Sequence, residues 1–252
     1  KQLAVNSGEQ PISCAPLVEA SFIGSLETLI LGRGTQTGDP FLKAVPRMRK
    51  LRELQLIYPR NLTPDDIAVF TALPALESAV FWGLSAKAFS ALSGFEKSTK
   101  LATLQLIDCE AHDGLAFIGR LRKLHSLILD GDDASGLTAA AGAPALRSIE
   151  FTSHGAPAND SALSTIANSF PRLERLHFGE ITPHNFTPEG IRSLAVLPRL
   201  GTLLWVKRPI TREILSEFAA LQHLTTLDLS GTGISDADLS ALTTSKSIST
   251  LI

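Results

Sequence analysis

A short apolar motif returns along the whole length of the chain. The copies are LETLIL at 26, LRELQL at 51, LESAVF at 76, LATLQL at 101, LHSLIL at 124, LRSIEF at 146, LERLHF at 173, LGTLLW at 200, LTTLDL at 224 and a truncated ISTLI at 248. The first nine lie 25, 25, 25, 23, 22, 27, 27 and 24 residues apart. Self-similarity at this period predicts stacked copies of one supersecondary unit.

Each copy predicts a strand followed by a helix. The alternating leucines face one side of a short strand and leave the intervening side chains on the other, and stacked strands form a parallel sheet. Most copies then carry an apolar pattern at helical spacing, such as Ile67, Phe70 and Leu73, which would pack behind the sheet. Helix starts are marked by NLTPDDI (61–67), with a Thr cap, a Pro and acids, and by the capping-box variant SDADL (235–239).

The glycines after the first copy have a second interpretation. Gly32, Gly34 and Gly38 could form a phosphate-binding loop, but such a site needs an acid about 20 residues on to hold the ribose. The next apolar run, 51–60, ends in Tyr-Pro-Arg without a carboxylate. We therefore interpret the glycines as the turn that leaves the first strand.

The segment LTTLDLSGTGISDADLSAL, residues 224–242, resembles bacterial leucine-rich repeats related to the ribonuclease-inhibitor and F-box-protein classes. The resemblance covers almost the whole chain. It implies an α/β leucine-rich-repeat solenoid, a curved horseshoe with a parallel β-sheet on the concave face and helices on the convex face, which binds other proteins on the sheet. The position that usually holds Asn varies from Gly34 to Thr232, so we expect no regular asparagine ladder.

We expect one solenoid over residues 1–252, because no linker or charge block interrupts the repeats. About ten repeats have strand cores near 26, 51, 76, 101, 124, 146, 173, 200, 224 and 248. Residues 1–22 are expected to be an incomplete preceding repeat or a cap, since LAVNSG at 3–8 lies about one repeat upstream of LILGRG. Both ends would then fall inside repeats, as in a fragment of a longer protein.

Composition and motifs narrow the function classes. A net charge of −2 gives no general attraction to phosphate backbones or anionic lipid, so we expect protein partners and no nucleic acid. No apolar run approaches the roughly 18 residues of a membrane span. Cys14 and Cys109 form no framework or C-x-x-C pair, and Asp130 begins a calcium-like loop that lacks its Gly and Glu. We expect a monomer with no catalysis, cofactor or metal.

The predicted contact residues are apolar positions that the repeat points toward solvent. Ile57, Trp82 and Ile107 occupy the same place in three consecutive repeats, with Tyr58 beside them and Val80 extending the group. Neighbouring strands lie about 4.8 Å apart, which predicts one contiguous patch. Exposed apolar patches and aromatic anchors mark contact surfaces. The alternative is that a preceding segment or an inward tilt of the sheet covers the patch.

A second group of candidates lies in later repeats. Glu150 and His177, with Arg175, complete the predicted partner contacts, and Asp130 and Glu180 would lie near them. A metal or acid/base cluster is one interpretation of these residues, and a solvated charged surface is the simpler one. Over the whole strand face, five basic residues stand against nine acidic ones, the wrong sign for binding phosphate.

These observations favour a non-catalytic protein-recognition module that binds its partner on the concave sheet. The alternative is the substrate-recognition domain of a larger bacterial effector or ubiquitin-ligase-like enzyme, whose catalytic part lies outside this chain. That reading implies secretion by a bacterium or delivery into a host cell. A third hypothesis, a secreted or surface adhesin, predicts a signal peptide upstream of Lys1.

Overall fold

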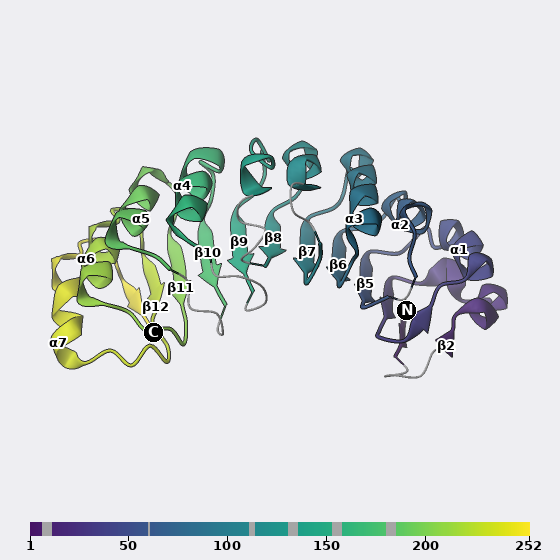
Figure 1. The fold of residues 1–252 in the computed structure, drawn as a ribbon, viewed down its shortest axis with the longest axis horizontal. Coiled ribbons are helices and arrows are strands. Elements are labelled where there is room, and N and C mark those ends of the chain that lie inside the picture. Colours follow the sequence, from purple (N-terminus) through teal and green to yellow (C-terminus); the bar gives the residue numbers. More distant parts are fainter. Residues whose placement is uncertain (7–11, 60, 111–113, 131–135, 153–157, 180–184) are drawn as a thin grey trace. The chain divides into compact units, whose positions relative to one another are not determined.

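The computed structural model describes seven segments of the chain, residues 1–6, 12–59, 61–110, 114–130, 136–152, 158–179 and 185–252. They fall into two compact units, Lys1–Leu124 (unit 1) and His125–Ile252 (unit 2). In each unit short parallel strands form a sheet and helices cover one of its faces (Figure 1). This is the predicted α/β leucine-rich-repeat solenoid fold. The extent of a single domain over 1–252 stays a prediction.

Unit 1 contains five strands of the main sheet. In order across the sheet they are β1 (Gln2–Val5), β3 (Thr28–Leu31), β5 (Glu53–Ile57), β6 (Ser78–Trp82) and β7 (Thr103–Ile107). Equivalent repeat positions pair directly, so that Leu29 lies opposite Leu54 and Leu54 opposite Ala79. A small separate pair is formed by β2 (Ile12–Ser13) and β4 (Thr35–Gln36). The 25-residue repeats therefore stack without a change of register.

Short helices connect the strands of unit 1. They are η1 (Ala15–Glu19), η2 (Ile23–Ser25), α1 (Asp39–Ala44), η3 (Val45–Arg47), α2 (Pro64–Thr71), α3 (Ala86–Ser90), η4 (Ala91–Lys97) and η5 (Gly114–Arg120). The predicted start of α2 is confirmed: Thr63 Oγ1 accepts a 3.3 Å hydrogen bond from the Asp66 amide, and Asp66 accepts one of 2.8 Å from the Thr63 amide. Ile67, Phe70 and Leu73 are buried as predicted.

Unit 2 repeats the same plan with less regular spacing. Its strands are β8 (Ser126–Leu129), β9 (Ser148–Phe151), β10 (Arg175–Phe178), β11 (Thr202–Trp205), β12 (Thr226–Asp228) and β13 (Thr250–Leu251). Its helices are α4 (Asp160–Ser169), α5 (Pro188–Arg192), η7 (Ser193–Val196), α6 (Arg212–Ala220), α7 (Asp236–Leu239) and η8 (Ser240–Thr244). The predicted capping box of α7 is confirmed by reciprocal bonds between Ser235 and Asp238.

The core of unit 2 is an aromatic column between sheet and helices. Phe178 stacks on Phe151 at 5.8 Å between ring centroids and contacts Phe186 at 4.8 Å. Trp205 continues the column toward Phe218 at 5.4 Å. Burying rings of this size contributes much of a small repeat's stability. The longer offsets in this unit are therefore compatible with a continuous core.

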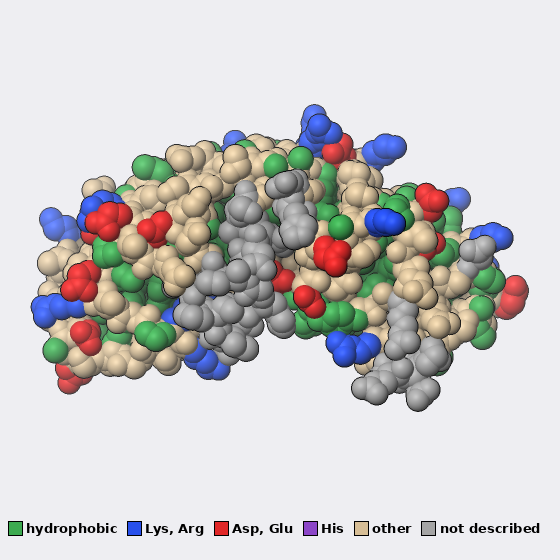
Figure 2. Space-filling view, viewed as in Figure 1, with side chains coloured by type: hydrophobic (Ala, Val, Ile, Leu, Met, Phe, Trp, Pro, Cys, Tyr) green, Lys and Arg blue, Asp and Glu red, His purple; other side chains and the backbone are tan. Residues whose placement is uncertain are grey.

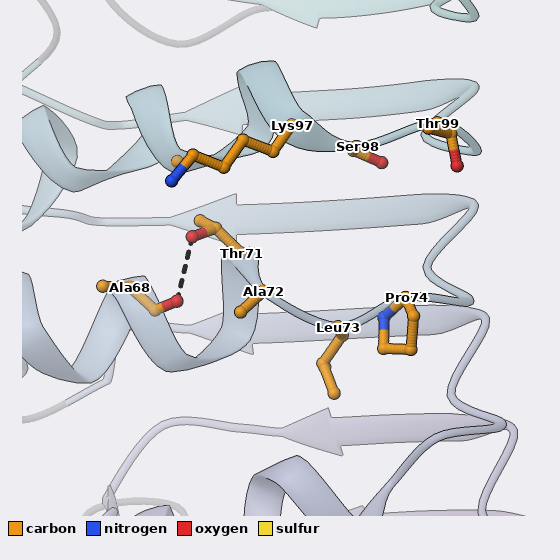
Figure 3. Close-up of a pocket in the computed structure, with 9 residues that line it drawn as sticks. Ala68, Thr71, Ala72, Leu73, Pro74, Lys97, Ser98 and Thr99 are labelled. Carbon is orange, nitrogen blue, oxygen red and sulfur yellow. Dashed lines mark hydrogen bonds between the residues drawn. The ribbon is translucent and has the colours of Figure 1, made fainter.

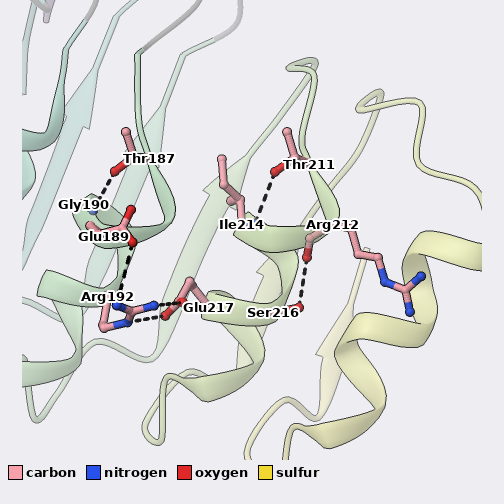
Figure 4. A network of polar contacts seen from close by, with 9 residues as sticks. All are labelled: Thr187, Glu189, Gly190, Arg192, Thr211, Arg212, Ile214, Ser216 and Glu217. Carbon is pink, nitrogen blue, oxygen red and sulfur yellow. Dashed lines mark hydrogen bonds and ion pairs between the residues drawn. The ribbon is translucent and has the colours of Figure 1, made fainter.

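Polar contacts join neighbouring helices of unit 2 on the outer side (Figure 4). Arg192 of α5 forms a two-pronged pair with Glu217 of α6, and Thr187 and Thr211 cap those two helices. Exposed pairs of this kind contribute little stability individually. None of the described helices is long and apolar enough to cross a membrane.

Candidate protein-binding surface

The predicted apolar row lies where unit 1's strands end. Ile57, Trp82 and Ile107 are direct partners across β5, β6 and β7. Ile57 and Trp82 are half-buried, whereas Ile107 is only 7% exposed. Val80 lies two residues before Trp82, on the same face of β6, and is 9% exposed. The sheet thus brings these residues together, as expected, but exposes mainly the first two.

The low exposure of Val80 and Ile107 corrects the expectation that both point freely into solvent. Val80 is flanked in register by Gln55 and Gln105, and Ile107 is flanked by Trp82. Strands only about 4.8 Å apart let longer side chains shield shorter neighbours. A role for either residue in partner contact stays a prediction.

A second row, one residue further along, repeats at an interval of 25: Arg33, Tyr58, Gly83 and Asp108. The Tyr58 hydroxyl donates a 2.7 Å hydrogen bond to Asp108 Oδ2, two repeats away. The Arg33 guanidinium carbon lies 4.4 Å from the centre of the Tyr58 ring. A cation over an aromatic face is attracted by the ring quadrupole. We call these four residues and Trp82 the aromatic edge.

Backbone geometry places the Tyr58 ring. Tyr58 and Asp108 have φ of 47° and 51°, and Gly83 has φ of 74°. The Tyr58 amide donates to the Trp82 carbonyl at 2.7 Å, which holds the turn against the next strand. A Cβ on Gly83 would lie 2.4 Å from Tyr58 Cδ1. The ring can therefore cross the intervening repeat only because that repeat has glycine there.

The two aromatic rings form a preassembled pair. Tyr58 and Trp82 stack with centroids 6.0 Å apart and an interplanar angle of 27°. Burial, followed by the hydrogen bond and charge of Asp108, raises the pKa of the Tyr58 hydroxyl. Figure 2 shows hydrophobic side chains gathered near the ends of β5 to β7, with acidic and basic side chains beside them. A rigid aromatic surface with a charged margin is well suited to bury against another protein.

Part of this arrangement is not predicted by the sequence pattern. The apolar repeat positions do not assign Arg33 and Asp108 to the contact site. The signal that would have found them is the constant 25-residue interval that also separates Tyr58 from Gly83. Three of these positions share a left-handed backbone, which residue type alone does not predict for Tyr or Asp.

Unit 2 brings together the remaining predicted contacts. Glu150 of β9 and His177 of β10 are register partners, with Nδ1 and Oε2 3.2 Å apart. The hydrogen bond from His177 lowers the pKa of Glu150, with a smaller contribution from the charge of Arg175. Ile128 and Leu204 continue this row on either side and are half-buried. The arrangement is a hydrogen-bonded carboxylate–imidazole pair in a partly apolar row.

Asp130 does not join Glu150 and His177 in a metal site within the described residues. Asp130 is 4% exposed and accepts a hydrogen bond from Thr152. Glu180 lies outside the described residues. Among the residues that the structure describes, no group of three or more His, Cys, Asp or Glu side chains could hold a metal ion.

One of the repeats matches a known family model. Residues 220–242 match the family model described as a leucine-rich repeat. An internalin, InlF, from Listeria monocytogenes is similar in structure, with 20% identity, 96% of this chain and 77% of that chain covered, and a TM-score of 0.45. A chain of the Rad7 and Elc1 complex from yeast shows 14% identity, coverage of 89% and 67%, and a TM-score of 0.48. No curated protein matches the sequence.

Proposed function

We propose that this leucine-rich-repeat protein is a non-catalytic recognition module that binds a partner protein on the open sheet face of unit 1. The carrying observation is the half-buried Tyr58–Trp82 pair, held in place by Arg33 and Asp108. Aromatic anchors that are rigid before binding lose little conformational entropy when they are buried.

The chemistry of the face indicates what kind of partner surface fits. The two central rows of unit 1, Ile30–Gln55–Val80–Gln105 and Ile57–Trp82–Ile107, contain no charged residue. Charges lie at the margins, with Glu53 at one side and Arg33 and Asp108 at the other. We infer a partner whose contact region is apolar at its centre and carries uncharged hydrogen-bonding groups for the two glutamines.

The test compares binding by wild type, Trp82→Asp and Tyr58→Ala at equal folded concentration. Partners captured from the native host's lysate are identified by mass spectrometry, and their affinities are then measured with purified components. We expect each change to cost at least about 2 kcal/mol of binding free energy. Val196→Asp is the matched control, because Val196 is 65% exposed and lies outside unit 1. Partners that bind all four proteins equally would refute the proposal.

A wider form of the proposal makes this module the substrate-recognition part of a larger bacterial effector or ubiquitin-ligase-like enzyme. The same contact residues would then select the substrate, with Glu150, His177 and Arg175 as a second contact region. The full-length reading frame distinguishes the two forms: a catalytic domain in the same chain supports the wider form, and its absence leaves a self-contained binding protein.

A further inference from the structure

Charge is unevenly distributed within unit 1. The segments that lead into its strands, 21–27, 46–52, 71–77, 96–102 and 119–124, contain nine Lys and Arg residues and three Glu residues. The rest of residues 1–124 contains five basic and nine acidic residues. The net charge is therefore +6 for the entry segments and −4 for the remainder of unit 1, whereas the net charge of the whole chain is only −2. The entry segments are therefore strongly basic, and the rest of unit 1 is acidic.

Parallel pairing in register places these segments at one edge of the sheet, at the strand starts. Lys50, Ala75 and Lys100 each immediately precede the first core leucine of their repeat, in three successive repeats. Strand spacing puts Lys50 and Lys100 roughly 10 Å apart at the backbone, on either side of the short Ala75. A groove of about 350 Å³ opens there and is also lined by Arg49, Arg52, Glu27 and Glu77.

Most of these cations make no ion pair with the residues that the structure describes. Arg52 pairs with Glu77 through two hydrogen bonds of 2.9 and 3.1 Å, and Arg120 pairs with Glu96. Six others are exposed and make no ion pair within the described part of the chain: Arg49, Lys50, Lys97, Lys100, Arg122 and Lys123. An unneutralised row of this kind attracts anionic groups over about a Debye length.

A neighbouring hollow extends the edge toward the helices. It measures about 450 Å³, lies between α2 and η4, and is lined by Lys97, Ser98 and Thr99 together with apolar residues such as Leu73 and Pro74 (Figure 3). Hydroxyl donors beside a lysine suit a carboxylate, and the apolar wall suits the side-chain stem that carries it. Lys97 and the two hydroxyl groups thus extend the basic edge beyond the groove.

We propose that this basic edge of unit 1 binds an acidic segment of a partner protein, with a carboxylate seated between Lys50 and Lys100. The proposal concerns a different surface from the sheet face and does not depend on the aromatic edge. Glu27 and Glu77 lie among the cations of the groove, and Glu77 is paired with Arg52, so Lys50 and Lys100 are spaced for separate carboxylates rather than for a continuous phosphate backbone. The acidic remainder of the unit likewise disfavours an extended polyanion or an anionic membrane.

The experiment measures binding of a fluorescein-labelled peptide, in which single glutamates are separated by glycine and serine, by fluorescence anisotropy. The edge variant is Lys50→Ser with Lys100→Ser. The control is Lys43→Ser with Lys87→Ser, which removes the same charge from exposed positions elsewhere in unit 1. We expect the edge variant to bind about tenfold more weakly, the control to match wild type, and wild-type binding to weaken as salt rises past roughly 0.1 M.

Two further probes make the outcome decisive. A single-stranded oligonucleotide of equal charge and phosphatidylserine vesicles should bind wild type more weakly than the peptide does. Lys50→Glu with Lys100→Glu should abolish peptide binding while leaving the thermal unfolding midpoint close to that of wild type. Equal peptide binding by edge and control variants would overturn the proposal, as would stronger binding of the oligonucleotide or the vesicles.

Discussion

The Tyr58 hydroxyl donates a 2.7 Å hydrogen bond to Asp108 although 50 residues separate them in sequence. The contact exists because two repeats of 25 residues return the chain to equivalent positions, and because Gly83 between them leaves room for the ring. Its chemistry is directly measurable, since burial and the Asp108 carboxylate both raise the pKa of this phenol.

Tyr58 is the single tyrosine of the chain, so the ultraviolet titration of tyrosinate reports this residue alone. We expect a midpoint above the ordinary value of about 10. Asp108→Asn should move the midpoint down, because it removes the negative charge that opposes ionisation. Asp65→Asn, an exposed acid on α2, should leave it unchanged. Identical midpoints in wild type and Asp108→Asn would show that the contact does not form in solution.

The same shift predicts a dependence of stability on pH. A group whose pKa is raised on folding stabilises the folded state below its unfolded pKa, and this contribution is lost as pH rises through the folded value. The free energy of unfolding should therefore fall as pH increases above about 10. Chemical denaturation at neutral and alkaline pH measures this fall. Tyr58→Phe should show a smaller decline over the same range.

Replacing Gly83 by Ala should destabilise unit 1 for two separable reasons. The positive φ of 74° costs an alanine about 1 to 2 kcal/mol, and the new Cβ would also displace the Tyr58 ring. Gly233→Ala is the control for the first effect, because Gly233 has φ of 72° and nothing within 4 Å of its Cβ position. In a double-mutant cycle, Tyr58→Ala should recover at least about 1 kcal/mol of the Gly83→Ala loss. Simple additivity would contradict the steric contact.

The Glu150–His177 pair predicts an acid-sensitive contribution in unit 2. A carboxyl whose pKa is lowered on folding contributes stability above its unfolded pKa, and this stability is lost as pH falls through the folded value. Glu150→Gln should thus cost less than about 1 kcal/mol at neutral pH, a modest value because the pair is partly exposed. Urea denaturation should show the difference from wild type begin to shrink as pH falls below about 4 and disappear at more acidic pH. A difference that persists there would assign the loss to packing.

The two tryptophans should differ in accessibility to a neutral quencher. Trp82 is half-buried at the aromatic edge, whereas Trp205 is 3% exposed within the core of unit 2. Acrylamide should therefore quench the Trp205→Phe protein, which keeps Trp82, several times more strongly than the Trp82→Phe protein. Equal quenching would mean that Trp82 is covered in solution and unavailable as an anchor.

Much of this architecture follows from the sequence. The constant period fixes which residues meet across the strands, so the row of Ile57, Trp82 and Ile107 is recoverable by aligning the copies. Capping chemistry is local, and the start of α2 at Thr63 is correspondingly clear. These features depend on interval and residue type alone.

Exposure and side-chain direction were less predictable. Whether Val80 is covered depends on the length of its neighbours on two other strands. The reach of Tyr58 to Asp108 depends on left-handed backbone at both residues, a conformation that the repeat pattern does not specify. Unit 2 is harder still, because offsets of 22 to 27 residues shift the turns between copies.

The uniform interval in unit 1 has a consequence at the level of the gene. Three successive offsets of 25 residues mean that a block of 25 codons can be duplicated or lost by recombination without disturbing the pairing of the strands on either side. Such an event would nevertheless change the side chain that Tyr58 contacts, because its hydroxyl bonds to the residue two repeats away. A change in copy number along this stretch would thus alter the aromatic edge while the strand pairing persists.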